Sequence, residues 1–347
     1  SAANAVISEN TSRKGKTLWT GNGKGDPLTL KIAQDERAEA DYAAVQIMQW
    51  YARGLNYRDM AILYRTNAQS LNFELAFKRN GVPHRVYGGM RFFDRAEIKD
   101  VVSYLAVVAN PNDDLRLLRI INTPPRGIGQ KTIDNVAAIA AAEQKPIFEV
   151  LQNIPKYPEL ASSSVKLSRF IDIMEELRNK VAQMRLDEFY DFLLDKTDYV
   201  RTLEEKATLE SETRIENVME LKSSIIDYVS RASQNASLPA YLDEIALYTD
   251  MDKSDPQNTD MVQLMTIHSA KGLEFSVVFL VGAEDGIFPG LQSIGEPEEM
   301  EEERRLCYVA MTRAKQKLYV TSAKRRMMYG KTMTNPPSRF LNILIKE

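Results

Sequence analysis

Strand-like and helix-like segments are distributed unevenly along this chain of 347 residues. Segments with the alternating or continuous apolar pattern of strands occur before residue 90 and after residue 260, and helical patterns separate them. Between about residues 95 and 248 the periodicity is almost entirely helical. Strands that alternate with helices are typical of a parallel sheet covered on both faces. We therefore predict an α/β domain with a parallel sheet, interrupted by an inserted all-α domain.

The predicted boundaries follow from this change of pattern. The discontinuous α/β domain is expected to comprise residues 1–90 and 256–347, and the helical insertion residues 91–255. Because the two ends of an insertion must lie close together, both boundaries are expected at loop-like breaks. Polar segments at residues 8–26 and 250–260 are expected to be connectors. The expected strands are residues 27–33, 60–64, 84–87, 261–267, 277–281 and 318–321, and the longest expected helix is residues 209–230.

Charge and cysteine content exclude several classes of protein. With 45 Lys and Arg against 48 Asp and Glu, the chain has no overall basic field, so any contact with nucleic acid must rest on local patches. The single cysteine, Cys307, excludes an intrachain disulfide, and the two histidines, His84 and His268, lie too far apart in sequence to favour a transition-metal enzyme. The sequence contains no run of about 18 apolar residues, so no membrane span is predicted. The first seven residues look like the end of a helix rather than a signal peptide, so we expect a piece of a longer protein.

Two Gly-Lys-Thr triplets, at residues 15–17 and 330–332, resemble part of a phosphate-binding loop. Such a loop needs another glycine five positions before the Gly of Gly-Lys, so that the backbone amides face the phosphates. Those positions hold Asn10 and Arg325, so neither triplet is expected to bind a nucleotide. Asp35-Glu36 is better explained by the cap and first turn of a helix than by a metal-holding pair. The chain is not expected to hydrolyse ATP by itself.

The loop at residues 266–275 joins two expected strands and is rich in polar groups. In an α/β sheet, ligands bind at the loops that leave the carboxyl ends of strands. A lone histidine is more often structural, but five polar side chains and a glycine in one such loop favour a binding site. The hydroxyl and imidazole groups suit phosphate oxygens, the lysine adds charge, and the glutamate suits a ribose hydroxyl. These side chains are Thr266, His268, Ser269, Lys271 and Glu274.

The segment at residues 296–314 predicts a helix with acids in its first turns and arginines later, as the helix dipole favours. That explanation accounts for the glutamates. It does not account for Thr312-Arg313, which lie where the helix gives way to the last expected strand. An arginine at that position can point out of the domain towards a phosphate held by another domain, as an arginine finger does.

Residues 267–275 (IHSAKGLEF) and 301–314 (EEERRLCYVAMTRA) closely resemble motifs V and VI of superfamily 1A DNA helicases of the UvrD/PcrA/Rep family. Residues 61–70, 87–100 and 122–134 resemble further segments of this family, in the family's order, so the resemblance extends over essentially the whole chain. It implies a RecA-like domain 2A interrupted by a helical domain 2B, which together form the C-terminal half of such a helicase. The Walker A and B motifs of the family belong to the N-terminal half, which is not in this sequence.

The resemblance also implies roles for individual residues. Arg313 would contact the γ-phosphate and act in catalysis, Glu274 would contact the ribose, and Lys271 and Gly272 would shape that edge of the nucleotide site. Thr266, His268 and Arg65 would contact the backbone of single-stranded DNA, which positions a strand without reading its sequence. The Gly-Ile-Gly element of domain 2B would bind duplex DNA, whereas from the residues alone an ordinary interhelical turn is favoured. The residues of that element are Arg126, Gly127, Ile128, Gly129 and Thr132.

The function implied is that of an ATP-dependent 3′–5′ DNA helicase or translocase in DNA repair or replication, acting in the cytoplasm. ATP with Mg²⁺ is expected in the full-length protein, and neither a nucleotide nor a metal is expected on this piece alone. The expected partners are single-stranded DNA, duplex junctions, the N-terminal domains 1A and 1B, and repair proteins, but no membrane. Two alternatives stay open. One is an isolated DNA-binding or protein-docking module, and the other is a RecB- or AddA-type helicase–nuclease subunit, which the end of the chain at Glu347 disfavours.

Three further positions have more than one interpretation. Leu71 stands where the family often has arginine, which would remove one DNA contact. Phe92 and Phe93 are suited to the core or to stacking on a base. The basic cluster at residues 324–326 is typical of a solvated face, with a contact to DNA as the alternative.

Overall fold

A parallel β-sheet organises one of the two units into which the chain folds. The computed structural model describes residues 2–10, 26–250 and 259–341, so the predicted connectors and the first Gly-Lys-Thr triplet lie largely or wholly outside the described residues. Unit 1 comprises Ser1–Phe92 and Asp252–Glu347, and unit 2 comprises Phe93–Met251. Unit 2 thus lies, in sequence, between the two segments of unit 1.

The sheet of unit 1 has six strands in the order β1-β6-β5-β2-β4-β3, and every neighbouring pair is parallel. The predicted parallel α/β fold is therefore confirmed, and each predicted strand is present with ends shifted by a few residues. β6 is longer than expected because it begins directly after Arg313. The strands are β1 (Thr29–Ala33), β2 (Met60–Tyr64), β3 (His84–Val86), β4 (Val262–Thr266), β5 (Phe275–Leu280) and β6 (Ala314–Ala323).

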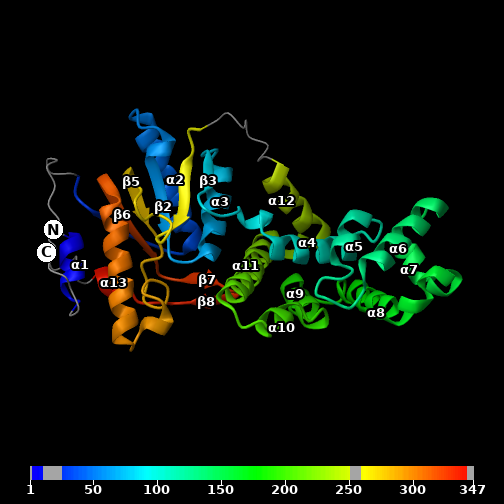
Figure 1. Ribbon diagram of the computed structural model, residues 1–347. Coiled ribbons are helices and arrows are strands. Elements are labelled where there is room, and N and C mark those ends of the chain that lie inside the picture. Colours follow the sequence, from blue (N-terminus) through cyan, green and yellow to red (C-terminus); the bar gives the residue numbers. More distant parts are fainter. Residues whose placement is uncertain (1, 11–25, 251–258, 342–347) are drawn as a thin grey trace. The chain divides into compact units, whose positions relative to one another are not determined.

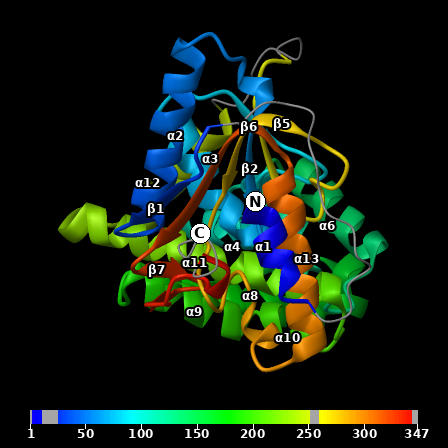
Figure 2. The same cartoon turned by 90° about the vertical axis from the view of Figure 1, so that its left-hand side faces the viewer.

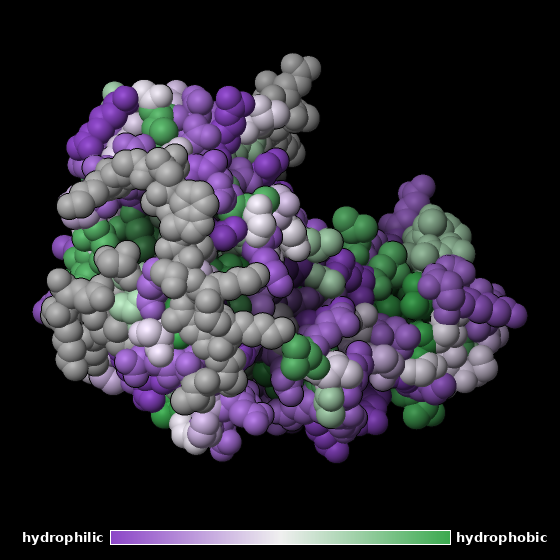
Figure 3. Space-filling view, turned by 60° about the vertical axis from the view of Figure 1, so that its left-hand side comes forward, coloured by the Kyte–Doolittle hydropathy of each residue, from purple (hydrophilic) through white to green (hydrophobic). Residues whose placement is uncertain are grey.

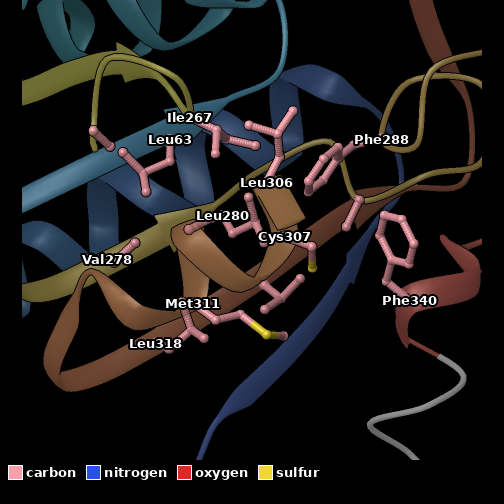
Figure 4. Packing of buried hydrophobic residues seen from close by; sticks show 14 of the residues in the cluster. Leu63, Ile267, Val278, Leu280, Phe288, Leu306, Cys307, Met311, Leu318 and Phe340 are labelled. Carbon is pink, nitrogen blue, oxygen red and sulfur yellow. The ribbon is translucent and has the colours of Figure 1, made fainter. Parts of the chain in front are cut away.

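Helices cover both faces of this sheet (Figures 1 and 2). Helices α2 (Glu36–Ala52) and α3 (Ser70–Arg79) pack on one face, and α1 (Ala2–Ser8) and α13 (Pro297–Thr312) pack on the other. Alternate residues of β2 therefore enter different cores: Ile62 lies with α2 and α3, and Leu63 lies with α13. Figure 4 shows the second core, in which Leu306, Cys307 and Met311 of α13 lie among side chains of the strands. Burial on both faces explains why the central strands are continuous apolar runs.

The cap predicted at Asp35 is confirmed. Its Oδ1 accepts a hydrogen bond of 2.8 Å from the backbone N–H of Ala38, in the first turn of α2. The neighbouring Glu36 accepts from the N–H of Met327 (3.0 Å), and burial raises the pKa of Glu36. The two acids therefore have structural partners. No cluster of three or more metal-ligating side chains occurs in the described part of the chain.

A small antiparallel hairpin follows the sheet and was not predicted. It consists of β7 (Arg326–Met328) and β8 (Lys331–Met333), joined by Tyr329-Gly330. Both turn residues have positive φ (54° and 74°), as a tight two-residue hairpin turn requires. The second Gly-Lys-Thr triplet is therefore part of this hairpin. The position of this triplet in a hairpin agrees with the prediction that it is not a phosphate-binding loop.

Unit 2 contains only helices among its described residues, 93–250. Its longest helix, α11, buries Val218, Leu221 and Ile225 along the predicted stripe. The helices are α4 (Ala96–Ala109), α5 (Asp114–Ile120), α6 (Gln130–Glu143), α7 (Ile147–Gln152), α8 (Ser164–Lys180), α9 (Leu186–Lys196), α10 (Tyr199–Glu204), α11 (Leu209–Ala232) and α12 (Leu238–Asp250). Short 3₁₀ helices are Tyr57–Asp59, Asn67–Gln69, Phe92–Asp94, Ile154–Lys156, Pro158–Ser163, Ser233–Asn235 and Leu291–Ser293.

Figure 3 shows a face that is largely hydrophilic, with separate hydrophobic patches. None of the described helices is both long and apolar enough to span a membrane.

The structure also places Phe92 and the basic cluster at residues 324–326, which had more than one interpretation. Phe92 is fully buried, so it belongs to the core and does not stack on a base. Arg326 is buried, whereas Lys324 and Arg325 are exposed. The cluster at residues 324–326 is therefore not one continuous basic surface.

Candidate nucleotide and nucleic-acid site

The structure brings three of the predicted DNA-contacting residues to one edge of the sheet. Tyr64 at the end of β2 pairs in register with Thr266 at the end of β4, and the N–H of Ile267 donates to the carbonyl of Tyr64 at 2.9 Å. Arg65 follows β2 directly, and His268 follows β4. The carboxyl ends of these two neighbouring strands therefore present Arg65, Thr266 and His268 together, where α/β domains usually bind ligands.

Arg65 is held by an acid that the sequence analysis attributed only to the helix dipole. Its Nε and Nη2 lie 2.9 and 2.8 Å from Oε1 of Glu303 on α13. The other oxygen of Glu303 accepts a hydrogen bond of 3.1 Å from the N–H of Gly290. The Arg65 side chain is 29% exposed and that of Glu303 only 3%. The pair thus has a buried carboxylate and a guanidinium that still reaches solvent.

The loop that carries Arg65 is fixed from behind by Gln69, which the sequence analysis also did not single out. Oε1 of Gln69 accepts hydrogen bonds of 3.0 Å from the N–H groups of both Arg65 and Thr66. Its Nε2 is buried without a hydrogen-bond partner among the described residues, and it rests against Gly282. Gly282 has φ of +67°, and a Cβ there would collide with this amide. The backbone at Arg65 is therefore held by a side chain that needs glycine at position 282.

His268 is exposed at the start of the loop and Thr266 is half-buried. Oγ1 of Thr266 lies 3.0 Å from Oγ of Ser269 and accepts from the N–H of Ser269 (3.3 Å), which orders the loop. Desolvation of the ring and the charge of Arg65 lower the pKa of His268, while Glu303 and Glu302 raise it in part. The lowered pKa favours the neutral imidazole at pH 7, which can take part in hydrogen bonds but carries no charge.

The second half of the same loop reaches the opposite edge of the sheet. β5 starts at Phe275, and the N–H of Phe275 donates to the carbonyl of Arg313 at 2.9 Å, directly before β6. Because all strands are parallel, the amino ends of β5 and β6 lie at the edge opposite to the carboxyl ends of β2 and β4. The loop at residues 266–275 therefore does not gather its polar groups at one edge, as its composition alone suggested. Leu273 and Phe275 contact Arg313, so Glu274 between them lies on the side of Arg313, whereas the N–H of Lys271 donates to the carbonyl of His268 at 3.3 Å.

Arg313 is half-buried and its guanidinium is held by neutral acceptors. Nη1 donates to the carbonyl of Leu273 (2.9 Å), Nε to that of Val309 (3.2 Å), and Nη2 to Oγ1 of Thr312 (3.0 Å). No carboxylate forms an ion pair with Arg313 among the described residues. Its positive charge is therefore oriented but not neutralised, which suits an anionic ligand.

The other predicted nucleotide contacts are at the surface. Lys271, Gly272 and Glu274 are exposed, and Gly272 has φ of +87° with open space around the position of a Cβ. Glu274 lies 3.6 Å from Lys315, and both side chains are 54% exposed, so this pair contributes little stability. These residues and Arg313 can contact parts of a nucleotide, but the described residues at this edge offer no glycine-rich cradle and no acidic cluster for a cation.

In unit 2 the Gly-Ile-Gly element is a turn between helices, with its backbone outward. Gly127 has φ of +70° and is exposed, as is Gly129, the residue that precedes α6. Ile128 is buried, so its side chain anchors the turn. Thr132 in the first turn of α6 lies 2.9 Å from the hydroxyl of Ser163. The glycine backbone and the start of α6 are therefore exposed at this turn.

Arg126 is used inside the unit rather than at its surface. Nη1 donates to the carbonyls of Ile120 and Pro124 (both 3.1 Å), and Nη2 donates to the Tyr104 hydroxyl (2.5 Å). The guanidinium also lies 5.5 Å from the centre of the Phe170 ring. This side chain therefore holds the shape of the Gly-Ile-Gly turn, and its direct contact with duplex DNA stays a prediction.

Lys166 places an exposed cation at this turn, in addition to the exposed Lys131 in the first turn of α6. The Nζ of Lys166 donates to the carbonyl of Gly127 at 2.8 Å. It lies about forty residues further along the chain, on α8, so spacing within residues 122–134 gives no indication of it. The tertiary contact alone brings it to the turn.

The fold and these sites define the class of the protein as a RecA-like α/β domain with candidate ligand-binding residues at two opposite edges of its sheet. Residues 1–325 match the family model described as the UvrD-like helicase C-terminal domain. The chain belongs to this family, and the resemblance inferred from its motifs is confirmed.

Named relatives agree with this assignment. The chain is 41% identical over 343 residues to the ATP-dependent DNA helicase PcrA of Staphylococcus epidermidis, an alignment that covers 98% of this chain and 47% of the relative. The ATP-dependent DNA helicase PcrA of Staphylococcus aureus gives the same identity and the same coverage. The chain therefore spans about half the length of the curated relatives that it matches.

Proposed function

We propose that this chain is the C-terminal half, domains 2A and 2B, of an ATP-dependent 3′–5′ DNA helicase. Unit 1 corresponds to domain 2A and unit 2 to domain 2B. The observation that carries the proposal is Arg313, whose guanidinium is oriented by Leu273, Val309 and Thr312 and has no carboxylate partner among the described residues. Such a group completes a nucleotide site whose phosphate cradle lies on another domain.

The residues at this edge fit the nucleotide of such a helicase only in part. Arg313 would stabilise negative charge on the γ-phosphate, and Glu274 would accept a hydrogen bond from the ribose. Lys271 and Gly272 would form the rim of the site. ATP with Mg²⁺ supplies the phosphoryl group that is transferred to water. Because neither a cradle nor a cation site occurs at this edge of the described residues, nucleotide binding requires the N-terminal domains 1A and 1B.

Single-stranded DNA would lie along the opposite edge of the same sheet. Arg65 offers charge, and Thr266 and neutral His268 offer hydrogen bonds to phosphate oxygens. Contacts of this kind place the strand without reading its sequence. The turn at residues 126–129 would approach duplex phosphates through glycine backbone and through the amides at the start of α6, while Arg126 holds the turn in shape.

ATP hydrolysis would move the enzyme only if the two states of the cleft bind ATP unequally. Arg313 supplies that difference, because it meets the γ-phosphate only when domain 2A has closed on the other domain. As the cleft closes and opens, the two domains would bind the DNA strand alternately. We further propose that the full-length protein acts in the cytoplasm in DNA repair or replication together with repair proteins.

Arg313→Ala in the full-length protein tests the catalytic role. An arginine finger contributes roughly 10³–10⁵ in rate, so the variant is expected to lose at least about 10³ in DNA-stimulated ATP turnover while its affinity for single-stranded DNA stays within twofold. Arg325→Ala, an exposed arginine of the same unit, is the matched control. Turnover near that of the control would refute the assignment.

The chain as it stands provides a second test. Fluorescence anisotropy with single-stranded and forked DNA is expected to show binding that weakens as salt rises, with no ATP turnover by the chain alone. Duplex binding is expected to weaken in a Lys166→Ala variant and to change little in Lys156→Ala, an exposed lysine elsewhere in unit 2. Brisk ATP hydrolysis by the chain alone would overturn the proposal of a shared nucleotide site.

A further inference from the structure

We infer that Glu303 is a positioning residue that holds Arg65 ready for the DNA strand and joins this contact to the helix that ends at Arg313. The inference rests on the proposed function, since it concerns the same strand-binding edge. It is carried by the ion pair between Arg65 and Glu303 and by the place of Glu303 on α13.

The geometry of the pair leaves Arg65 able to bind a second anion. A guanidinium has five N–H donors; Nε of Arg65 donates to Oε1 of Glu303, and Nη2 lies 2.8 Å from the same oxygen. The side chain of Arg65 is 29% exposed, so donors that Glu303 does not engage are available to a second anion. Because the carboxylate is buried and is itself held by the N–H of Gly290, it fixes the guanidinium plane. An arginine held in this way loses less rotamer freedom when it binds a phosphate.

The pair also links the two edges of the sheet. Glu303 lies near the carboxyl ends of β2 and β4 through its contact with Arg65, and Arg313 follows the last residue of α13. The two residues are ten positions apart in sequence (303 to 313), a rise of about 15 Å along a helix. Leu306, Cys307 and Met311 of α13 pack in the core (Figure 4), and the hydrogen-bonded backbone makes the helix between Glu303 and Arg313 stiff. A shift of Arg65 on binding a strand is thereby transmitted to the helix that carries Arg313.

A simple charge effect and a positioning effect predict opposite results when the charge of Glu303 is removed. A carboxylate beside a DNA site repels phosphates, so its neutralisation alone would tighten binding. If Glu303 positions Arg65, neutralisation frees the guanidinium and weakens binding. The sign of the change in DNA affinity therefore distinguishes the charge effect from the positioning effect.

The test measures binding of fluorescein-labelled oligo-dT by the chain at several salt concentrations. Glu303→Gln is expected to weaken binding about tenfold, the value of one hydrogen-bonded charged contact. The slope of log affinity against log salt is expected to fall by about 0.7, as for one lost phosphate contact, which a partly unfolded sample would not produce. Glu302→Gln is the matched control, because Glu302 is 57% exposed, pairs with Arg305 and carries the same charge. Equal or tighter binding by Glu303→Gln would overturn the inference.

A double-mutant cycle separates positioning from a general loss of structure. In an Arg65→Ala background, Glu303→Gln is expected to change affinity by less than twofold, and a full tenfold effect there would overturn the inference. Should Glu303→Gln fail to fold, Arg65→Lys replaces it. Lysine keeps the charge, but its single ammonium cannot bridge Glu303 in the same geometry, so binding should again weaken about tenfold. Unchanged affinity of Arg65→Lys would count against the inference.

The outcomes for the proposed function and for this inference are distinguishable. If the unmodified chain does not bind oligo-dT at low salt, the proposed strand-binding edge is wrong and the inference is wrong with it. If the unmodified chain binds and Glu303→Gln binds equally well, only the inference fails.

Discussion

Replacing Arg326 with methionine removes the cation between two buried carboxylates. Nη2 of Arg326 lies 2.6 Å from Oε2 of Glu39 and 2.6 Å from Oε1 of Glu284, and all three side chains are at most 4% exposed. Glu39 also accepts from the N–H of Gly282 (3.0 Å), and Glu284 from that of Ala323 (2.7 Å). The network thus joins α2, the loop after β5, the end of β6 and the hairpin.

The expected magnitude follows from this burial. Breaking a buried ion pair by removing one partner costs about 3–5 kcal/mol, because the other charge stays buried and uncompensated. Methionine fills the space of the arginine stem, so little of this loss comes from a cavity. For a unit of this size each kcal/mol lowers the melting temperature by about 2–4 °C, which gives a decrease of roughly 6–20 °C.

Thermal and urea denaturation followed by circular dichroism measure the loss. The control is Arg325→Met, since Arg325 is the exposed neighbour and its replacement should change stability by less than about 0.5 kcal/mol. Replacing Glu39, Glu284 and Arg326 together with apolar residues should recover most of the stability. A loss below 1 kcal/mol in Arg326→Met, or one equal to that of the control, would show that the network does not hold these elements together.

Three other perturbations have defined outcomes. Gly282→Ala forces a positive φ on alanine and displaces the Gln69 amide, so urea denaturation should show a loss of about 1–3 kcal/mol. Arg65→Ala removes a charge that lowers the pKa of His268, so this pKa should rise in an NMR titration, and the part of the stability that is lost on acidification because of His268 should become smaller; an unchanged pKa would place Arg65 away from the ring. Asp35→Ala removes the cap of α2 and should cost about 1 kcal/mol, whereas no loss would mean that the cap is dispensable.

The fold was predictable because its strands and helices have clear patterns. The central strands are buried on both faces, so β2 and β5 read as continuous apolar runs, and α11 shows an apolar stripe over its length. The hairpin of β7 and β8 was missed because each strand has only three residues, too few to establish a pattern. The burial of Arg326 was missed for a related reason, since a basic cluster in sequence gives no sign that one member faces inward.

The candidate site was predictable in position but not in its internal contacts. Motif resemblance identified Arg65, His268 and Arg313, and the turn at residues 126–129. It did not identify Glu303 or Gln69, whose importance depends on contacts between segments far apart in the chain. Glu303 stands among other glutamates at the start of a helix, where the dipole already accounts for acids. Only its burial distinguishes it, and burial is a property of the folded chain.

The separation of the two edges is a consequence of the parallel topology. In a β–α–β connection the chain leaves the carboxyl end of one strand and must return to the amino end of the next. α13 makes this return between β5 and β6, so a residue near its start and a residue just after its end necessarily lie at opposite edges of the sheet. Glu303 lies in the first half of α13 and contacts Arg65 at the carboxyl end of β2, and Arg313 directly follows the helix. Any event that shifts the start of α13 therefore acts on the end that carries Arg313, and the same helix that closes the core becomes the physical link between the proposed strand-binding and nucleotide-binding edges.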